Sequence, residues 1–138
     1  VPHDSLILEV TETAMIADHK AAIENLQKLS DAGIMMSIDD FGTGYSSYSY
    51  LQQFPVNELK IDKSFIQSLL TETSSEKLVG SMIALGKDFG LSVLAEGIET
   101  VEVLDRLVEL GCEYGQGYLI AKPMPVEDMT AWLDKPDW

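Results

Sequence analysis

Strand-like apolar runs alternate with helix-like segments along the whole 138-residue chain. This alternation is typical of repeated strand–helix units, which build a mainly parallel sheet covered by helices. The fold class that follows is α/β. The expected strands are Leu6 to Thr11, Ile34 to Asp39, Glu58 to Ile61, Ser92 to Glu96 and Tyr118 to Ala121.

Four helices are expected between and after these strands. Each has residues that suit its start, and the first three are each followed by a glycine that suits their end. The delimiting residues are Asp18 and Gly33 for the first helix, Thr73 to Glu76 with capping-box spacing and Gly90 for the second, Thr100 and Gly111 for the third, and Pro125 for the last.

The charge balance excludes one broad class of function. The chain holds 9 basic and 23 acidic residues, which gives a formal net charge of −14 at pH 7, and Arg106 is its one arginine. DNA and RNA backbones are held by clustered Lys and Arg, so binding to a nucleic-acid polymer is not expected. An anionic ligand would instead need a metal ion to offset its charge.

Cysteine content and hydropathy bear on location. Cys112 is the single cysteine, so the chain cannot form an internal disulfide. No signal peptide is found, and no apolar run approaches the roughly 20 residues of a membrane span. A cytoplasmic location is therefore expected, with any membrane anchor of the parent protein carried by other domains.

Polar and charged residues gather where the expected strands end. In a βα barrel the carboxyl ends of all strands open on one face, and active sites are built on that face. These residues recur at intervals that average close to one βα unit of roughly 30 residues, so we expect them to converge. In chain order they are Glu9 and Glu12, Asp39 and Asp40, Lys60 and Asp62, Glu96 and Glu99, and Gln116.

The carboxylates of this group indicate an all-oxygen metal site. Glu9, Asp39, Asp40 and Glu96 have no Cys or His in the same pattern, so Mg²⁺, Mn²⁺ or Ca²⁺ would fit, and a thiolate or imidazole zinc site would not. Two metals about 3.5–4 Å apart, bridged by a carboxylate, would activate a water and stabilise the leaving oxygen in phosphoryl displacement. Lys60 would add one fixed positive charge.

Asp39 and Asp40 are adjacent, which poses a geometric problem. On a regular strand their side chains would point to opposite faces, so both can serve one site only if the strand ends there. Gly42 and Gly44 supply the expected break, because glycine lets the backbone turn sharply.

Each of these residues also has a simpler interpretation that involves no functional site. Any single acidic residue at a strand end is often merely solvated, and only their repetition favours a site. Lys60 could form an ion pair with Asp62, its same-face neighbour two residues on. The run from Gly42 to Gly44 lacks the third glycine of a dinucleotide-binding turn, so a plain turn is the better interpretation. Cys112 is expected to be a packed thiol rather than a nucleophile.

Five motifs, in order, resemble those of the EAL-domain cyclic di-GMP phosphodiesterases. The similarity runs from about Leu6 to Leu133. The motifs are Glu9-Val10-Thr11-Glu12, Asp39-Asp40-Phe41-Gly42-Thr43-Gly44-Tyr45-Ser46-Ser47, Leu59-Lys60-Ile61-Asp62, Ala95-Glu96-Gly97-Ile98-Glu99-Thr100 and Gly115-Gln116-Gly117-Tyr118.

The resemblance implies a (β/α)8 TIM-like barrel that hydrolyses cyclic di-GMP to linear pGpG with Mg²⁺ or Mn²⁺. It also implies a role for each matching residue. By this resemblance Glu9, Asp39 and Asp40 are metal ligands, Lys60 positions water or phosphate, and Glu96 is a base or metal-site carboxylate. Asp62, Glu99 and Gln116 line or brace the pocket. Glu12 holds the loop from Phe41 to Ser47, and this loop links the metal site to a dimer interface.

One part of the family pattern does not occur in this chain. The Glu-Ala-Leu motif and an Asn-containing strand lie upstream of the Glu9 motif in the family, and neither is found here. We therefore expect residues 1–138 to be the C-terminal portion of an EAL-type barrel, with about five strands, whose N-terminal portion is absent. A barrel of this class needs roughly 250 residues.

These expectations lead to two hypotheses about function. In the first, the parent domain hydrolyses cyclic di-GMP under the control of regulatory domains elsewhere in the parent chain, and this fragment alone is inactive. In the second, the parent is a degenerate module that binds cyclic di-GMP or a protein without catalysis. Unpaired strand edges also favour a homodimer.

Overall fold

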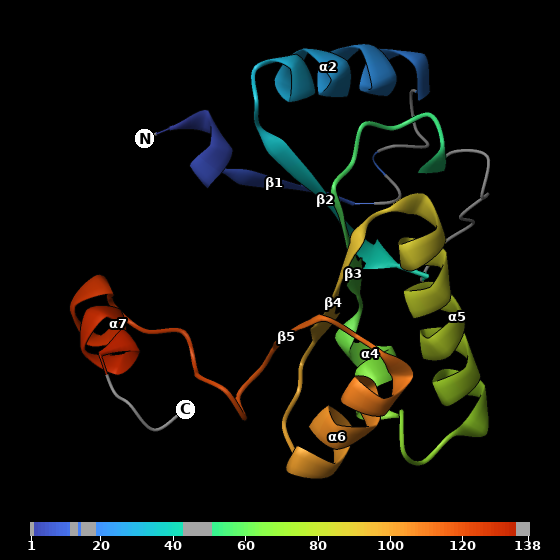
Figure 1. Cartoon of the computed structure of the whole chain (residues 1–138), viewed down its shortest axis with the longest axis vertical. Coiled ribbons are helices and arrows are strands. Elements are labelled where there is room, and N and C mark those ends of the chain that lie inside the picture. Colours follow the sequence, from blue (N-terminus) through green and yellow to red (C-terminus); the bar gives the residue numbers. More distant parts are fainter. Residues whose placement is uncertain (1, 12–13, 15–18, 43–50, 135–138) are drawn as a thin grey trace.

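The computed structural model describes residues 2–11, 14, 19–42 and 51–134. Helices and strands alternate along most of this length (Figure 1). Their bounds are η1 His3–Ser5, β1 Ile7–Thr11, α2 His19–Asp31, β2 Met35–Phe41, β3 Glu58–Ile61, α4 Lys63–Gln67, α5 Thr73–Phe89, β4 Ser92–Glu96, α6 Val101–Leu110, β5 Tyr114–Gln116 and α7 Val126–Leu133.

The five strands form one parallel sheet in the order β1-β2-β3-β4-β5. Each strand therefore pairs with its neighbours in sequence, and each connection carries the chain back to the starting end of the sheet. Consecutive parallel strands in this order are the arrangement of a (β/α)8 barrel, of which five strands are present. The α/β fold class is confirmed, and the first four strands lie where the sequence predicts them.

The fifth strand was predicted in the wrong place. The apolar run from Tyr118 to Ala121 forms a turn, in which the backbone N–H groups of Ile120 and Ala121 donate to the carbonyl of Gly117 at 3.0 and 3.1 Å. Strand β5 lies earlier, at Tyr114–Gln116. The chain leaves the sheet at Gly117 because it passes so close to Ile98 that a Cβ there would lie 2.1 Å from the Ile98 carbonyl oxygen.

Most of the predicted helix limits are confirmed. Thr100 caps α6 by accepting a hydrogen bond from the Val103 backbone N–H, and Gly90 and Gly111 end α5 and α6 in the left-handed conformation. Pro125 precedes α7 as its N-cap. Asp18 lies outside the described residues.

Two details around α5 differ from the sequence prediction. Its N-cap is Glu72, so the capping box expected at Thr73 is wrong. The Ser75 hydroxyl instead accepts a hydrogen bond from the Ser68 hydroxyl at 2.7 Å, which ties the start of α5 to the preceding turn. The short helix α4, which begins directly after Asp62, was not predicted from the sequence.

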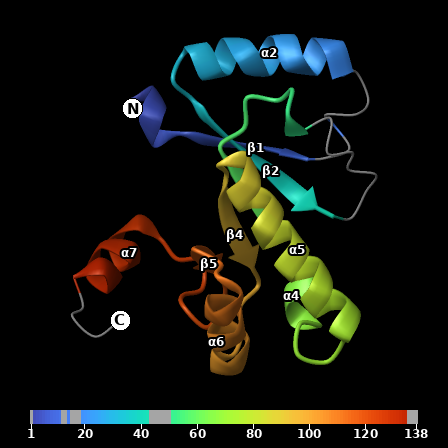
Figure 2. The same ribbon diagram turned by 45° about the vertical axis from the view of Figure 1, so that its right-hand side comes forward.

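The core lies between strands β2 to β4 and helices α4, α5 and α6, which sit together in both views (Figures 1 and 2). Helix α7 stands apart from these helices, and none of its residues is buried. No helix among the described residues is both long and apolar enough to cross a membrane. The largest fully buried side chains include Met36, Ile38, Leu59, Ile61, Ile66, Leu69, Ile83, Ile98 and Leu107.

Two glycines of α5 provide a test of how tightly this helix packs on the sheet. A Cβ at Gly86 would lie 2.2 Å from Cγ2 of Val93 in β4, whereas a Cβ at Gly80 would have its nearest contact at 3.8 Å. We expect Gly86→Ala to lower the free energy of unfolding by about 1–3 kcal/mol through overpacking. Gly80→Ala should raise it by roughly 0.5–1 kcal/mol, because alanine favours the helix.

Urea unfolding of the two variants and the parent chain measures both effects. Each substitution adds one methyl group to the same helix, so helix propensity is matched and the difference reports packing alone. Equal changes in the two variants would contradict the close approach of α5 to β4.

Candidate active site

An irregularity in the pairing of β2 with β3 brings Asp39 and Asp40 to the same end of the sheet. Ile38 pairs with Leu59 and Phe41 pairs with Ile61, so both aspartates lie opposite the single residue Lys60. This two-against-one pairing is a β-bulge, which bends the strand and redirects its side chains.

The bulge corrects the expected position of the strand break. β2 continues through Phe41, and the unusual conformation belongs to Asp40 itself, at φ 55°. Asp40 is the one non-glycine residue with positive φ among the described part of the chain. Aspartate tolerates this conformation better than most residues. The break therefore precedes Gly42 rather than being made by the glycines, and Gly44 lies outside the described residues.

Lys60 is the centre of an ion cluster that links four strands. Its Nζ lies 2.6 Å from Oε1 of Glu9, 2.7 Å from Oε1 of Glu96 and 3.4 Å from Oδ1 of Asp39. Its side chain is 7% exposed, whereas that of Glu9 is 55% exposed. A buried ammonium group therefore holds together carboxylates from β1, β2 and β4.

The cluster keeps Lys60 charged. Burial disfavours the ammonium form, but hydrogen bonds to Glu9 and Glu96, with the charges of Glu96 and Asp39, more than offset burial and raise the pKa of Lys60 above its ordinary value. Lys60 thus carries a full positive charge throughout the physiological pH range.

Asp62 is occupied elsewhere, so the alternative ion pair between Lys60 and Asp62 is not the arrangement found. Asp62 caps α4, accepting a hydrogen bond from the Ser64 backbone N–H at 2.9 Å and another from the Ser64 hydroxyl. Burial acts to raise the pKa of Asp62, but these hydrogen bonds outweigh it and lower the pKa. Its role in the structure is to fix the start of α4 directly after Lys60 and Ile61.

The two adjacent aspartates make an electrostatically strained pair. The negative charge of Asp39, aided by desolvation and by Asp62, raises the pKa of Asp40. Among the described residues, no group donates a hydrogen bond to the buried Oδ1 of Asp39, and the positive charge that lies near it is Lys60 Nζ at 3.4 Å. A cation between these carboxylates would reduce the repulsion between Asp39 and Asp40 and would add positive charge beside Oδ1 of Asp39.

The chemistry of this donor set fits a hard divalent cation, because every available donor is a carboxylate oxygen. The described residues do not complete a site by themselves. Among them, no group of three His, Cys, Asp or Glu side chains is arranged to hold a metal ion. Asp39 and Asp40 can therefore contribute to a metal site that needs further ligands.

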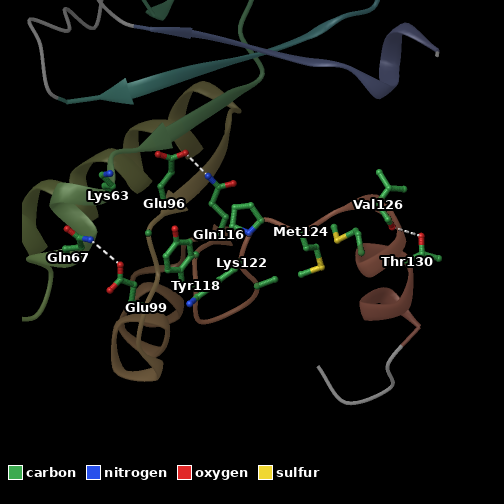
Figure 3. A pocket seen from close by; sticks show the side chains of 15 residues that line it. Lys63, Gln67, Glu96, Glu99, Gln116, Tyr118, Lys122, Met124, Val126 and Thr130 are labelled. Atoms are coloured by element: carbon green, nitrogen blue, oxygen red, sulfur yellow. Dashed lines mark hydrogen bonds between the residues drawn. The ribbon is translucent and has the colours of Figure 1, made fainter.

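Glu96 connects the ion cluster to a neighbouring cavity of about 770 Å³ (Figure 3). Gln116 Nε2 donates to Oε1 of Glu96 at 2.7 Å, the same oxygen that pairs with Lys60. Glu99 also lines the cavity, where its Oε1 accepts a hydrogen bond from Gln67 at 3.4 Å. Three of the predicted site residues, Glu96, Glu99 and Gln116, thus line one cavity.

Several residues of this cavity were not predicted from the sequence. Lys63 and Gln67 lie four residues apart on α4, a spacing that would have placed them on one face had this helix been predicted. Lys122 Nζ lies 5.3 Å from the ring centroid of Tyr118, which is a cation–π distance. Both residues follow β5, so the misplacement of that strand concealed them.

Two further sequence predictions concern Glu12 and Cys112. Glu12 and the loop residues 43–47 lie outside the described residues, so the expected contact between them is not seen. Cys112 is a packed thiol: its Sγ lies 3.6 Å from the Val93 carbonyl oxygen, and burial raises its pKa. A raised pKa leaves less thiolate, which disfavours a nucleophilic role.

A family model and two curated relatives match most of this chain. The family model described as EAL domain matches residues 1–123. MucR of Pseudomonas aeruginosa, named a bifunctional diguanylate cyclase/cyclic di-GMP phosphodiesterase, is 45% identical over 126 residues, which are 91% of this chain and 18% of MucR. RocR of the same species, named a cyclic di-GMP phosphodiesterase, is 42% identical over 91% of this chain and 32% of RocR.

Solved structures give the same fold. The MucR phosphodiesterase in complex with c-di-GMP superposes with a TM-score of 0.91 at 43% identity, over 94% of this chain and 52% of that one. Klebsiella pneumoniae BlrP1, in a manganese/cy-diGMP complex, superposes with a TM-score of 0.83 at 33% identity, over 89% of this chain and 31% of BlrP1. This chain thus spans about half of the solved MucR phosphodiesterase and less of the curated relatives.

The ion cluster predicts a large effect of removing Lys60. Lys60→Met would leave three carboxylates without their shared counter-charge, and we expect the free energy of unfolding at pH 7 to fall by about 2–4 kcal/mol. The expected loss of unfolding free energy is smaller than for a fully buried ion pair, because the Glu9 side chain is partly solvated. The raised pKa means that the contribution of Lys60 is present below its unfolded-state pKa of about 10.4 and is lost only as pH rises through the folded-state value.

Urea unfolding of Lys60→Met and of Lys63→Met measures this difference. Lys63 is the matched control, because it is an exposed lysine three residues away with no ion pair among the described residues. A similar small loss in both variants would show that the ion cluster contributes little to stability.

Proposed function

The chain belongs to the EAL domain family, and on that basis we propose that its parent domain is a metal-dependent phosphodiesterase that hydrolyses cyclic di-GMP to linear pGpG. The observation that carries this proposal is the Lys60 cluster, which gathers Glu9, Asp39 and Glu96 at the carboxyl ends of parallel strands. The names of MucR and RocR and the c-di-GMP complex of the MucR phosphodiesterase support the choice of substrate.

We propose that Glu9, Asp39 and Asp40 are ligands for Mg²⁺ or Mn²⁺. Three features support this assignment: their oxygen donors, the burial of Oδ1 of Asp39 without a hydrogen-bond donor among the described residues, and the mutual repulsion of the two aspartates. Solved relatives include complexes with manganese and with calcium. A bound divalent cation would supply positive charge against a substrate phosphate and lower the pKa of an attacking water.

Lys60 and Glu96 are the proposed catalytic residues. Lys60 Nζ places a permanent positive charge at the end of the sheet, where it can orient a water or a phosphate oxygen. Glu96 Oε1 accepts hydrogen bonds from both Lys60 and Gln116, which fix the carboxylate in one orientation. A carboxylate held in this way can take a proton from water as a general base or bind the metal.

Gln116, Glu99 and Asp62 complete the proposed site. Gln116 and Glu99 line the cavity beside Glu96, which gives them access to a ligand in it. Asp62 acts by fixing the position of α4 and its neighbour Lys60. Glu12 keeps the role that the resemblance implies, as a support of the loop after Asp40.

We further propose that residues 1–138 are the C-terminal portion of the domain and that this portion alone is inactive. The described residues offer no complete set of three metal ligands, and the open sheet leaves part of the site unbuilt. MucR and RocR extend far beyond the matched region, which supports further regulatory domains in the parent.

A second candidate function is a binding module without catalysis. The observation that fits it is the cavity beside Glu96, which Glu99 and Gln116 also line. Such a module would retain the cavity beside Glu96 and bind cyclic di-GMP without releasing pGpG. Location follows from the parent in either case, and we propose the cytoplasm for this domain.

We also propose that the chain forms a homodimer through the β1 side of the sheet. Ile7 and Leu8 of β1 are exposed, although both are large apolar residues. Among the described residues, β1 has a strand partner on one side only, so its other edge offers backbone groups for pairing. β1 also pairs with β2, and β2 leads into the loop that the resemblance places near a dimer contact.

Sedimentation velocity of the 138-residue chain at low micromolar concentration tests this assembly. We expect a mass of twice 15.2 kDa, with the high negative charge opposing larger aggregates. A compact monomer at the same concentration would show that the β1 edge does not need a partner.

Hydrolysis is best tested in the full-length parent protein. We expect it to convert cyclic di-GMP to pGpG with Mg²⁺ or Mn²⁺ and to lose activity when EDTA removes the metal. Glu96→Gln should lower kcat by roughly 10²–10⁴, as for loss of a general base. Glu24→Gln, the same change at an exposed position on α2, should leave kcat unchanged.

The readout is the rate of pGpG formation, measured by chromatography, beside the affinity for cyclic di-GMP. The isolated 138-residue chain should form no pGpG. A parent that binds cyclic di-GMP but forms none would establish the second candidate instead of the first.

A further inference from the structure

Ile98 is a buried residue that has no part in the proposed site. It lies in the loop between β4 and α6, two residues after Glu96, and it is 1% exposed. The described residues that line the cavity beside Glu96 do not include it. It nevertheless packs against the two glycines that flank Gln116, Gly115 and Gly117.

Gly97 turns the chain so that Ile98 leaves the face that carries Glu96. On a regular strand, residues two apart share a face, so Ile98 would lie on the same side as Glu96 and Gln116. Gly97 instead has φ 75°, a left-handed conformation that glycine adopts without strain. Ile98 is therefore able to pack on the opposite face of β5.

The two glycines leave room for Ile98 that no other residue would leave. A Cβ at Gly115 would lie 2.5 Å from Cδ1 of Ile98, and a Cβ at Gly117 would lie 2.1 Å from the Ile98 carbonyl oxygen. Both distances are far shorter than a van der Waals contact. A side chain at either position would therefore push Ile98 and β5 apart.

Backbone hydrogen bonds hold Ile98 in this place. Its N–H donates to the Gln116 carbonyl at 3.1 Å, and its carbonyl accepts from the Leu119 N–H at 3.0 Å. Glu96 and Gln116 are the last register partners in the pairing of β4 with β5. Ile98 thus fixes the two strands relative to each other directly beyond the pair that Glu96 and Gln116 make.

The side-chain contact at this point belongs to the proposed active site. Gln116 Nε2 donates to Oε1 of Glu96 at 2.7 Å, and Lys60 Nζ lies 2.7 Å from the same oxygen. A shift of Gln116 by about 1 Å would take this contact beyond hydrogen-bond length. The Glu96 carboxylate would then lose one of the two partners that orient it, and misplacement of this size can cost roughly 10²-fold in rate.

We propose that Ile98 is a positioning residue, which holds the Gln116 carboxamide on Glu96 through its contacts with Gly115 and Gly117. The inference rests on the proposed function, because it concerns how Glu96 is oriented to act on water or metal. Neither Ile98 nor Gly115 is among the described residues that line the cavity, so both act through Gln116 rather than on a ligand.

The test is a compensating pair of substitutions in the full-length parent protein. Gly115→Ala adds the Cβ that lies 2.5 Å from Cδ1 of Ile98, and Ile98→Val removes that Cδ1 and leaves Cγ1 at 3.9 Å. We expect Gly115→Ala to lower kcat about tenfold or more, with KM for cyclic di-GMP changed by less than about threefold. Ile98→Val alone and the double variant should both keep kcat within about threefold of the parent value.

Two controls separate positioning from a loss of stability. Gly86→Ala also overpacks the sheet, because its Cβ would lie 2.2 Å from Cγ2 of Val93, but Gly86 is not among the described residues that line the cavity. It should lower stability to urea and leave kcat unchanged. In a Gln116→Ala background, Gly115→Ala should lower kcat no further, because both substitutions act through one contact.

A second readout follows the Gln116 side-chain amide by NMR in protein labelled at glutamine nitrogen, where Gln116→Ala identifies the signal. This readout does not need catalysis. We expect Gly115→Ala to speed exchange of these amide protons with water about tenfold, and the double variant to restore slow exchange.

Equal kcat values for Gly115→Ala and Gly86→Ala would overturn the proposal. A double variant no more active than Gly115→Ala, or a fall in kcat without a change in the Gln116 amide, would also overturn it. A parent that forms no pGpG, but whose Gln116 amide responds and recovers as expected, would contradict the proposed activity and support the positioning of Gln116 by Ile98.

Discussion

The rest of the site depends on one buried positive charge. Lys60 lies near the carboxyl end of β3, the middle strand of the sheet, where burial alone would favour its neutral form. It stays charged because Glu9, Asp39 and Glu96 surround it, and these three come from strands on both sides. A buried charge of this kind is tolerated only when its partners are fixed, so the positions of four strands and the charge of the site are linked.

The bulge in β2 is the second constraint. In a regular strand only one of Asp39 and Asp40 could face Lys60, but the bulge places both opposite it. The cost is a left-handed residue and two carboxylates that repel each other. Such conformations persist where surrounding structure enforces them, and they cluster at functional sites. The strained pair is therefore the local feature that most strongly supports the proposed cation site.

Local patterns in the sequence predicted those features that depend on local physics. The apolar runs of β1 to β4 and the glycines after α5 and α6 lie where expected, because strand periodicity and left-handed caps are set by few residues. β5 was misplaced because a close backbone approach at Gly117, between segments far apart in sequence, decides where the strand ends. The partners of Lys60 and the cavity residues Lys63 and Lys122 likewise depend on tertiary contacts that spacing alone does not give.

The protonation state of Lys60 in solution is the sharpest test of the ion cluster. Nitrogen-detected NMR of the side-chain ammonium groups during a pH titration would resolve Lys60 from the other lysines. We expect that the Lys60 ammonium protons exchange slowly with water and that the group stays protonated above pH 10.4, about the ordinary lysine value. Titration of Lys60 together with the exposed lysines, with equally fast proton exchange, would contradict the ion cluster and the site built on it.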